Sequence, residues 1–402
     1  MKRKGLREQG QALILIALAA IGLFGFTALA IDGSAAFSDR AQAQNAADTA
    51  AFAAALTRIR GGDWVQSGLA RAEINGYQND GQSNVVHVHC PPESGQYAGN
   101  SEYLQVIIES TIQTTFARVV GVNQVHNWVE AVTHVEPPTR APLYSGAAMV
   151  ALKPEGRGAF RSHGTNATSV VGSGIFVNSN NSCAFEQVGN SVIDALAGIQ
   201  IVGGACLNGS ITPATSITPK AAPVPYPPVN LPPEPSCAQD AVQSGNTLSP
   251  GNWSETFPPR GVTHLQPGIY CVEGMFMVNA HDTLTGDGVL IYMRSGNVHW
   301  DGKAQINLTA PTSGPYAGLL IYLPMSNEEG MIINGNSDSS FVGTFLAPAS
   351  DIQINGTAGV EGYHSQIIGY TIDLIGTADM LVEYNQNENL IVDFPALLGL
   401  VE

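Results

Sequence analysis

The chain has 402 residues, of which 44 are glycine and only 12% are charged, and this composition favours short strands joined by turns over a charge-rich helical protein. The net charge is −16, and from Ser162 to the end four Lys or Arg residues stand against twenty Asp or Glu residues. So acidic a surface repels nucleic acid, which binds to clustered Lys and Arg, and we expect no nucleic-acid partner.

The N-terminal region predicts a single-pass membrane protein. Residues 1–11 form a basic tail, and residues 12–31 form an apolar run without a charged side chain. In a helix, about twenty such residues cross a bilayer core of about 30 Å. Basic residues before the run and Asp32 after it place the N-terminus in the cytoplasm and the bulk of the chain outside. A cleaved signal peptide remains the alternative, because Ala28-Leu29-Ala30 fits the cleavage pattern, and it would also export the chain.

Residues 34–78 predict extracytoplasmic helices. The stretch 35–59 is rich in alanine and contains neither Pro nor Gly, and Gly61-Gly62 then separates it from a second helical stretch at about 64–77. A membrane helix that continues into an Ala-rich helix is suited to lateral packing with like helices. Packing of the same helix on its own soluble domain is an equally open interpretation.

A sequence motif runs through both helical segments. It consists of Gly10-Gln11, the apolar run, Ala30-Ile31-Asp32, and the stretch QNAADTAA at 44–51. Over roughly residues 9–57 the chain resembles TadG-like proteins of the Tad, or Flp, pilus assembly system. This resemblance implies a membrane anchor, an exported remainder, and contacts with other pilus-biogenesis or envelope proteins. Neither Gly5 nor Gly10 has a Glu five residues later, as processed pseudopilins do, so we do not expect prepilin-peptidase cleavage.

Residues 79–138 predict a small α+β module. Strand patterns cover 85–89, 103–112 and 124–135, with a helical turn at 115–120. His87 and His89 would share one face of a strand, next to Cys90, but no third ligand is assignable nearby. We therefore assign no metal site here.

Internal repeats dominate the C-terminal region. A unit of the form hydrophobic–x–hydrophobic–x–Gly–x–small recurs four times, at 298–304, 331–337, 352–358 and 372–378. A second unit at 288–293 returns at 318–323 and, more loosely, at 343–348. Repeats of about 20–30 residues built from short strands predict a parallel β-helix, which we extend over 145–395. A β-sandwich or jelly roll is the alternative.

The Pro-rich stretch 211–235 interrupts this region. Nine prolines within it disfavour regular strands and favour an extended excursion. We expect a surface loop laid against the solenoid, with a linker between two domains as the other interpretation.

Five cysteines are present, and none forms a CxxC or a Cys/His metal spacing. In an exported domain, Cys183 with Cys206 and Cys237 with Cys271 are candidate disulfides, which leaves Cys90 over. Buried free thiols are the alternative.

The sequence offers weak candidates for catalysis. Asp282 with Asp287 and Glu328 with Glu329 are the carboxylate pairs that could serve a glycosidase mechanism, and the turn 334–340 is rich in oxygen ligands for Ca²⁺. The chain lacks GxSxG, HExxH, Walker A and dinucleotide-binding glycine patterns. We assign no catalytic residue, no cofactor and no metal.

Three functions stay open from the sequence. The first is a membrane-anchored structural component of a Tad-type pilus or adhesion apparatus whose acidic domain contacts a surface or a carbohydrate. The second is an anchored β-helix enzyme acting on carbohydrates, and the third is an exported surface protein unrelated to pili.

Overall fold

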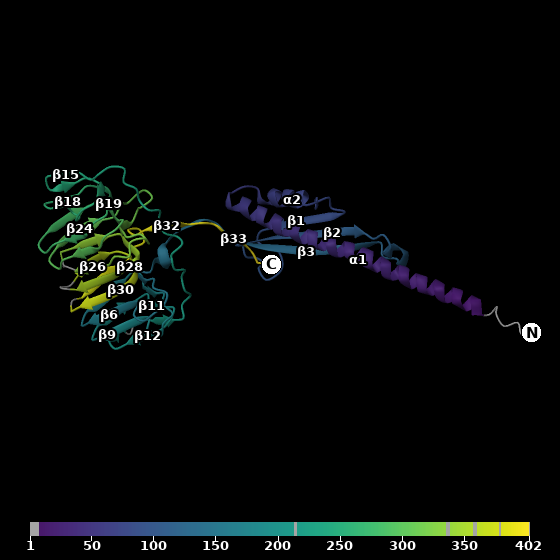
Figure 1. The fold of residues 1–402 in the computed structure, drawn as a ribbon, viewed down its shortest axis with the longest axis horizontal. Coiled ribbons are helices and arrows are strands. Elements are labelled where there is room, and N and C mark those ends of the chain that lie inside the picture. Colours follow the sequence, from purple (N-terminus) through teal and green to yellow (C-terminus); the bar gives the residue numbers. More distant parts are fainter. Residues whose placement is uncertain (1–7, 213–214, 335–337, 357–359, 378, 402) are drawn as a thin grey trace, which may run out of the picture. The chain divides into compact units, whose positions relative to one another are not determined.

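Figure 1 shows the computed structural model, which describes residues 8–212, 215–334, 338–356, 360–377 and 379–401. The chain divides into two compact units. Unit 1 runs to Thr139 and resumes at Pro395, and unit 2 comprises Arg140–Phe394. Unit 2 is therefore an insertion between two segments of unit 1.

Unit 1 begins with one long helix. Helix α1 (Glu8–Ile59) runs without interruption through the apolar run and the Ala-rich stretch, so the prediction of a membrane helix that continues into an Ala-rich helix is confirmed in its helical geometry. The helix ends just before Gly61-Gly62. Helix α2 (Trp64–Ile74) then starts at Asp63, whose carboxylate accepts a hydrogen bond from the backbone N–H of Gln66 at 3.1 Å.

The sheet of unit 1 has four antiparallel strands, in the order β1 (Asn84–His89), β2 (Tyr103–Gln113), β3 (Gln124–Glu136) and β33 (Leu397–Leu400). The 3₁₀ helix η1 (Ala117–Val120) joins β2 to β3. The predicted α+β module is thus present. Its fourth strand was not predicted, because β33 comes from the far end of the sequence and pairs with β3 through Thr133 and Leu400.

Alanine allows α1 to lie close to this sheet. Seven alanines of the helix are buried against apolar residues of the strands and of α2, and they are Ala43, Ala46, Ala47, Ala50, Ala51, Ala54 and Ala55. Their partners include Leu104, Val106 and Ile108 on β2. Because each alanine contributes only a methyl group, α1 adds little bulk to the layer of strand side chains that separates its backbone from the sheet.

Unit 2 is a parallel β-solenoid of about ten turns, as the repeats predicted. The first of its sheets has eleven strands, in the spatial order β13 (Ser210–Ile211), β10 (Val192–Ala195), β7 (Ala167–Val171), β31 (Met380–Glu383), β29 (Val360–His364), β27 (Ser340–Val342), β24 (Gln305–Thr309), β21 (Thr283–Gly286), β18 (His264–Leu265), β16 (Thr247–Leu248) and β15 (Gln243–Ser244).

A second sheet of sixteen strands forms the two other faces of the coils. One face contains β14 (Ile217–Pro219), β11 (Ile199–Ile201), β8 (Ile175–Val177), β5 (Met149–Ala151), β30 (Ile367–Gly376), β28 (Thr344–Gly356), β25 (Leu319–Tyr322), β22 (Val289–Met293), β19 (Gly268–Val272) and β17 (Gly251–Trp253). The long strands β30 and β28 continue into the other face, beside β12 (Ala205–Leu207), β9 (Phe185–Gly189), β6 (Phe160–Gly164), β26 (Met331–Asn334), β23 (Val298–Trp300) and β20 (Phe276–Val278). A two-stranded pair, β4 (Thr139–Pro142) with β32 (Ile391–Phe394), lies where the chain enters and leaves unit 2.

The sequence repeats stack in register. Val298 lies beside Met331, Met331 beside Ile352, and Ile352 beside Ile372 on successive strands. The looser copy at 343–348 is offset, because an irregularity between Leu319 and Ile321 shifts the pairing of β25 with β28. The residues 335–337, 357, 358 and 378 of these repeats lie outside the described part of the chain.

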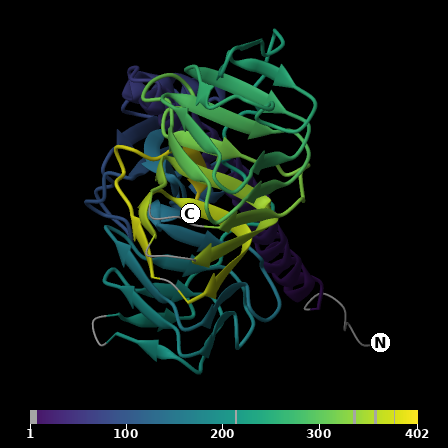
Figure 2. The ribbon, with the colours of Figure 1, turned by 90° about the vertical axis from the view of Figure 1, so that its left-hand side faces the viewer.

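The coils do not stack in sequence order. The coils of residues 149–211 extend from the middle of the solenoid to one end, and those of residues 243–383 start at the opposite end and return to the middle. Figure 2 shows this as teal strands at one end, green strands at the other and yellow strands between them. The two groups meet at a seam, defined by the pairing of β30 with β5 and β6 and of β31 with β7.

The Pro-rich stretch connects the two ends of the stack and covers an apolar surface on the way. Val224, Tyr226 and Leu231 pack on outward-facing residues of the second sheet, among them Leu290 and Tyr292 of β22. The neighbours Val289, Ile291 and Met293 of the same strand point into the solenoid core. All five residues of β22 are buried because the strand is covered on both faces.

Candidate functional site

The first half of α1 exposes large apolar side chains. Leu13, Ile16, Leu23, Phe24 and Phe26 each expose between 68% and 77% of their surface. Among the described residues, this is the one helix that is long and apolar enough to cross a membrane. Such a continuous apolar surface on a folded protein indicates contact with lipid or with other apolar helices.

Asp32, the first charged residue after the apolar run, holds the loop between β2 and β3. Its carboxylate accepts backbone hydrogen bonds from Thr115 at 2.9 Å, Phe116 at 2.9 Å and Ala117 at 2.6 Å. These donors, that of Ala117 first, lower the pKa of Asp32 below its ordinary value. The contact fixes the loop beside the end of the apolar run.

A second polar contact fixes α1 on the sheet, seven residues further along the helix. Asp39 accepts hydrogen bonds from Ser110 of β2, from Asn127 of β3 at 2.8 Å and from the hydroxyl of Tyr77 at 3.0 Å. Burial, with the carboxylate of Asp39 nearby, raises the pKa of Tyr77. The position of the helix on the sheet is therefore fixed by directional bonds as well as by alanine packing.

The structure brings the four cysteines of unit 2 together in two pairs. Cys183 is bonded to Cys206, with their Cα atoms 5.0 Å apart, and Cys237 is bonded to Cys271, with their Cα atoms 6.1 Å apart. The first bond links neighbouring coils, and the second fastens the segment that follows the Pro-rich stretch to β19. Cys90 is free, and burial raises the pKa of its thiol.

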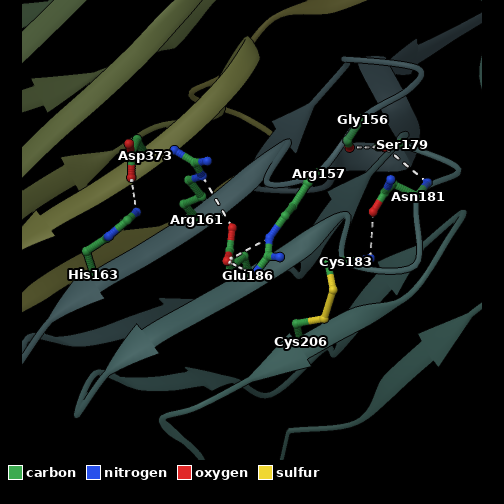
Figure 3. A network of polar contacts seen from close by, with 10 residues as sticks. All are labelled: Gly156, Arg157, Arg161, His163, Ser179, Asn181, Cys183, Glu186, Cys206 and Asp373. Carbon is green, nitrogen blue, oxygen red and sulfur yellow. Dashed lines mark hydrogen bonds and ion pairs between the residues drawn. A yellow bond between two sulfur atoms is a disulfide. The ribbon is translucent and has the colours of Figure 1, made fainter.

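A cluster of charged side chains lies on the outer face of the seam (Figure 3). In the register of three adjacent strands, Arg161 of β6 lies between Asp373 of β30 and Glu186 of β9. Arg157 donates to Glu186 through Nε at 3.0 Å, Arg161 pairs with the same carboxylate at 3.5 Å, and His163 pairs with Asp373 at 3.3 Å. Opposite charges on neighbouring strands favour this register over a slipped one.

The two carboxyl groups of this seam cluster respond to their surroundings in opposite ways. The hydrogen bond from Arg157 is the main cause that lowers the pKa of Glu186, and the charges of Arg157 and Arg161 act in the same direction. Burial raises the pKa of Asp373, although His163 and Arg161 partly oppose this. A cavity of about 330 Å³ beside the cluster is lined by Lys153, Arg157 and Arg161 together with Asp351 and Asp373.

Of the two carboxylate pairs that the sequence offered, Asp282 with Asp287 is too widely spaced for a glycosidase mechanism. Asp282 and Asp287 flank β21, so their backbones are about 16 Å apart at about 3.3 Å per residue, beyond the roughly 5–9.5 Å that such a pair needs. Asp282 accepts a hydrogen bond from Asn279 at 3.1 Å, and Asp287 accepts one from Thr309 at 3.2 Å. Glu328 and Glu329 are exposed on the loop between β25 and β26.

The described residues contain no group of three or more His, Cys, Asp or Glu side chains arranged to hold a metal ion. His87 and His89 are stacked on β1 with ring centroids 5.6 Å apart, and His89 pairs with Glu93 at 3.0 Å. Part of the turn 334–340, residues 335–337, lies outside the described chain. The amide of Asn334 is engaged, since it donates to the carbonyl of Trp300 at 2.6 Å and accepts from Asn355 at 2.7 Å.

Comparison with known proteins places one segment of the chain. Residues 10–57 match the family described as putative Flp pilus-assembly TadE/G-like. The match covers the apolar run and the Ala-rich part of α1, and so confirms the resemblance drawn from the motif. No curated protein and no solved structure matches the chain.

Two features escape sequence reasoning. The sequence marks Asp32 only as the first charge after the apolar run, and its role in holding a loop 83 residues away has no local signal. The seam cluster leaves only a partial signal, because Lys153, Arg157 and Arg161 recur at four-residue steps with Glu155 as the one acidic residue among them. Its anionic partners come from strands that are distant in sequence, and no local pattern assigns them.

Proposed function

We propose that this protein is a membrane-anchored structural component of a Tad/Flp-type pilus or adhesion apparatus and displays its acidic solenoid outside the cytoplasm. The observation that carries the proposal is the family match over 10–57, on a helix whose first half exposes large apolar side chains and whose second half is packed on a sheet. Basic residues before the apolar run and Asp32 after it support the orientation.

The proposed role is structural rather than catalytic. The solenoid presents eight Lys or Arg residues against twenty Asp or Glu residues, so it would repel anionic polymers and lipid headgroups over most of its surface. Its basic side chains at the seam are engaged with Glu186 and its neighbours, which suits a rigid spacer. Contacts with other pilus-biogenesis or envelope proteins, and with a surface or a carbohydrate, belong to this proposal.

Membrane fractionation of the full chain, combined with determination of its mature N-terminus, tests the anchor. We expect the intact protein to stay in the membrane fraction after alkaline washing. Protease added outside the cytoplasmic membrane should digest unit 2. A Leu18→Arg/Ile21→Arg variant should leave the membrane fraction, because each Arg near the centre of a span costs about 2.5–3.5 kcal/mol. Ala41→Arg, at an exposed position of the same helix beyond Asp32, should not.

Two results would overturn this proposal. Unprocessed protein that is freely soluble in the cytosol would exclude a membrane anchor. Cleavage after Ala30 with release of the remainder would instead support an exported protein unrelated to pili.

A further inference from the structure

The loop between β2 and β3 carries an apolar tip that nothing in unit 1 covers among the residues described. Val119 exposes 90% of its surface, Val122 46% and Phe116 43%. Arg118 lies among them and is also exposed. The loop is closed by the backbone N–H of Thr114, which donates to the carbonyl of Asn123 at 3.0 Å, so the apolar residues form the tip of a defined turn.

The position of this tip along α1 is fixed. Three backbone N–H groups of the loop, from Thr115 to Ala117, bind the carboxylate of Asp32. Asp32 directly follows the last residue of the apolar run, Ile31, which exposes 44% of its surface. The loop tip therefore lies at the depth where the apolar run ends.

We propose that this loop tip, formed by the side chains of Phe116, Val119 and Val122, is a second membrane contact that inserts into the headgroup and acyl boundary of the leaflet in which α1 ends. This inference rests on the proposed membrane anchor. Aromatic and aliphatic side chains with a nearby Arg suit that boundary, because the apolar groups leave water while the guanidinium reaches lipid phosphate. With α1, the loop gives unit 1 two points of attachment and so fixes its tilt on the membrane.

A lipid surface is favoured over a protein partner because the apolar surface of α1 and the apolar loop tip adjoin each other. The apolar surface of α1 ends at Ile31, and the apolar loop tip is held at the next residue by hydrogen bonds within the same chain. One environment, the bilayer, then accounts for both exposed apolar surfaces. A second copy of the chain, or a pilus protein seated on the loop, would shield the tip from water without bringing it near lipid.

The test uses the full chain with Cys90→Ser, reconstituted into phosphatidylcholine/phosphatidylglycerol vesicles, with one added cysteine carrying a polarity-sensitive fluorophore. Val119→Cys reports on the loop, and Phe24→Cys reports on the apolar run. Gln96→Cys is the matched control, since it is exposed on the loop that packs near Gln105, and Gln105 is about 26 Å along β2 from the end that carries the tested loop. Lipids spin-labelled near the headgroup or deep in the acyl chains serve as quenchers.

We expect a blue-shifted emission at position 119 that headgroup-labelled lipid quenches strongly, deep quenching at position 24, and a water-like emission at position 96. Adding Asp32→Ala should release the loop and reduce the quenching at position 119 while leaving position 24 unchanged. A water-like signal at position 119 with position 24 quenched would overturn this inference and leave the anchor standing. A blue shift at position 119 without lipid quenching would assign the loop to a protein partner, and loss of quenching at position 24 would overturn the anchor itself.

Discussion

In unit 1 a single long helix lies on one face of an antiparallel sheet, whereas in unit 2 the chain winds into stacked parallel coils and the described residues form no α-helix. The helix of unit 1 approaches its sheet through buried alanines such as Ala47 and Ala50. The coils of unit 2 approach one another through glycines such as Gly164, which sits against a carbonyl of the neighbouring coil. Each unit therefore depends on small residues where its elements pack most tightly, which are alanines between helix and sheet in unit 1 and glycines between coils in unit 2.

The two units also share a property. Each is completed by a segment that is remote in sequence, since β33 pairs with β3 in unit 1 and β30 pairs with β6 in unit 2. The helix of unit 1 is held by directional hydrogen bonds to Asp39, and the seam of unit 2 is held by charged pairs. Four predictions follow from these two observations: the different small residues that allow close packing in each unit, and the remote segments that complete both units.

The largest loss of stability is expected from a substitution between two adjacent coils of unit 2. Gly164 has a φ of +103°, and a Cβ there would lie 2.2 Å from the carbonyl oxygen of Gly376 across the seam. Gly164→Ala should destabilise unit 2 by more than about 4 kcal/mol, because it adds a backbone clash to the cost of a left-handed conformation. Hydrogen-exchange mass spectrometry of the full chain would show deprotection of the seam strands, with unit 1 unchanged.

Gly314→Ala is the control for this substitution. Gly314 also has a positive φ, of +85°, but no atom lies within 4 Å of the point that a Cβ would occupy there. It should cost only about 1–2 kcal/mol, the backbone penalty alone. Equal losses in the two alanine variants would show that the approach of the coils at Gly164 does not limit unit 2.

The second largest effect is expected from reduction of the disulfides, which should lower the stability of unit 2 but not that of unit 1. The bonds join cysteines 23 and 34 residues apart, for which chain entropy predicts about 3–4 kcal/mol each. A reductant, or the pairs Cys183→Ser/Cys206→Ser and Cys237→Ser/Cys271→Ser, should lower the unfolding free energy of unit 2. Unit 1, whose one cysteine is free, should unfold as before.

Mass spectrometry of peptides from unreduced protein identifies the linked pairs directly. Linked Cys183–Cys206 and Cys237–Cys271 peptides are the expected result. Unlinked peptides, with unfolding insensitive to reductant, would favour buried free thiols. A different linkage would contradict the stacking of the coils around β9 and β12.

Replacing a buried alanine of α1 with a larger residue tests whether the packing of this helix on the sheet stabilises unit 1. Ala47→Leu places three extra carbon atoms between α1 and the strands and should destabilise unit 1 by about 1–3 kcal/mol. Ala41→Leu, at an exposed position of the same helix, keeps helix propensity similar and should have little effect. Thermal unfolding and hydrogen exchange of α1 would measure both, and similar losses would mean that helix propensity rather than packing is responsible.

The sequence predicted those parts of the fold in which neighbours in space are neighbours in the chain. The repeats from Val298 to Ile372 stack in order, so their spacing indicated the register of β23, β26, β28 and β30. The Ala-rich end of α1 and the strands β1, β2 and β3 were predicted from local periodicity, with ends within one or two residues.

The remainder depends on contacts without a local pattern. Nothing in the sequence around Phe160 or Leu400 indicates that these residues pair with β30 and β3. The same holds for the site, because Asp32 meets the β2–β3 loop and Arg161 meets Asp373 only once the chain has closed on itself. Long-range pairing therefore set the limit of the prediction.

The smallest effect is expected at the seam, where two carboxyl groups should respond to pH in opposite directions. The pKa of Glu186 is lowered in the folded state, so its stabilising effect is present above its unfolded value of about 4.5 and is lost as the pH falls through the folded value. Glu186→Gln should therefore cost about 1 kcal/mol of stability at neutral pH. This cost is modest because Arg157 is largely exposed, and the difference from wild type should vanish in acid.

The pKa of Asp373 is raised, so its charge disfavours the folded state once the pH rises above 3.8, and Asp373→Asn should not destabilise unit 2 at neutral pH. Urea unfolding across pH 3–8 measures both variants, and equal losses at neutral pH would show that the seam is held by charge neutralisation as a whole rather than by the guanidinium groups around Glu186.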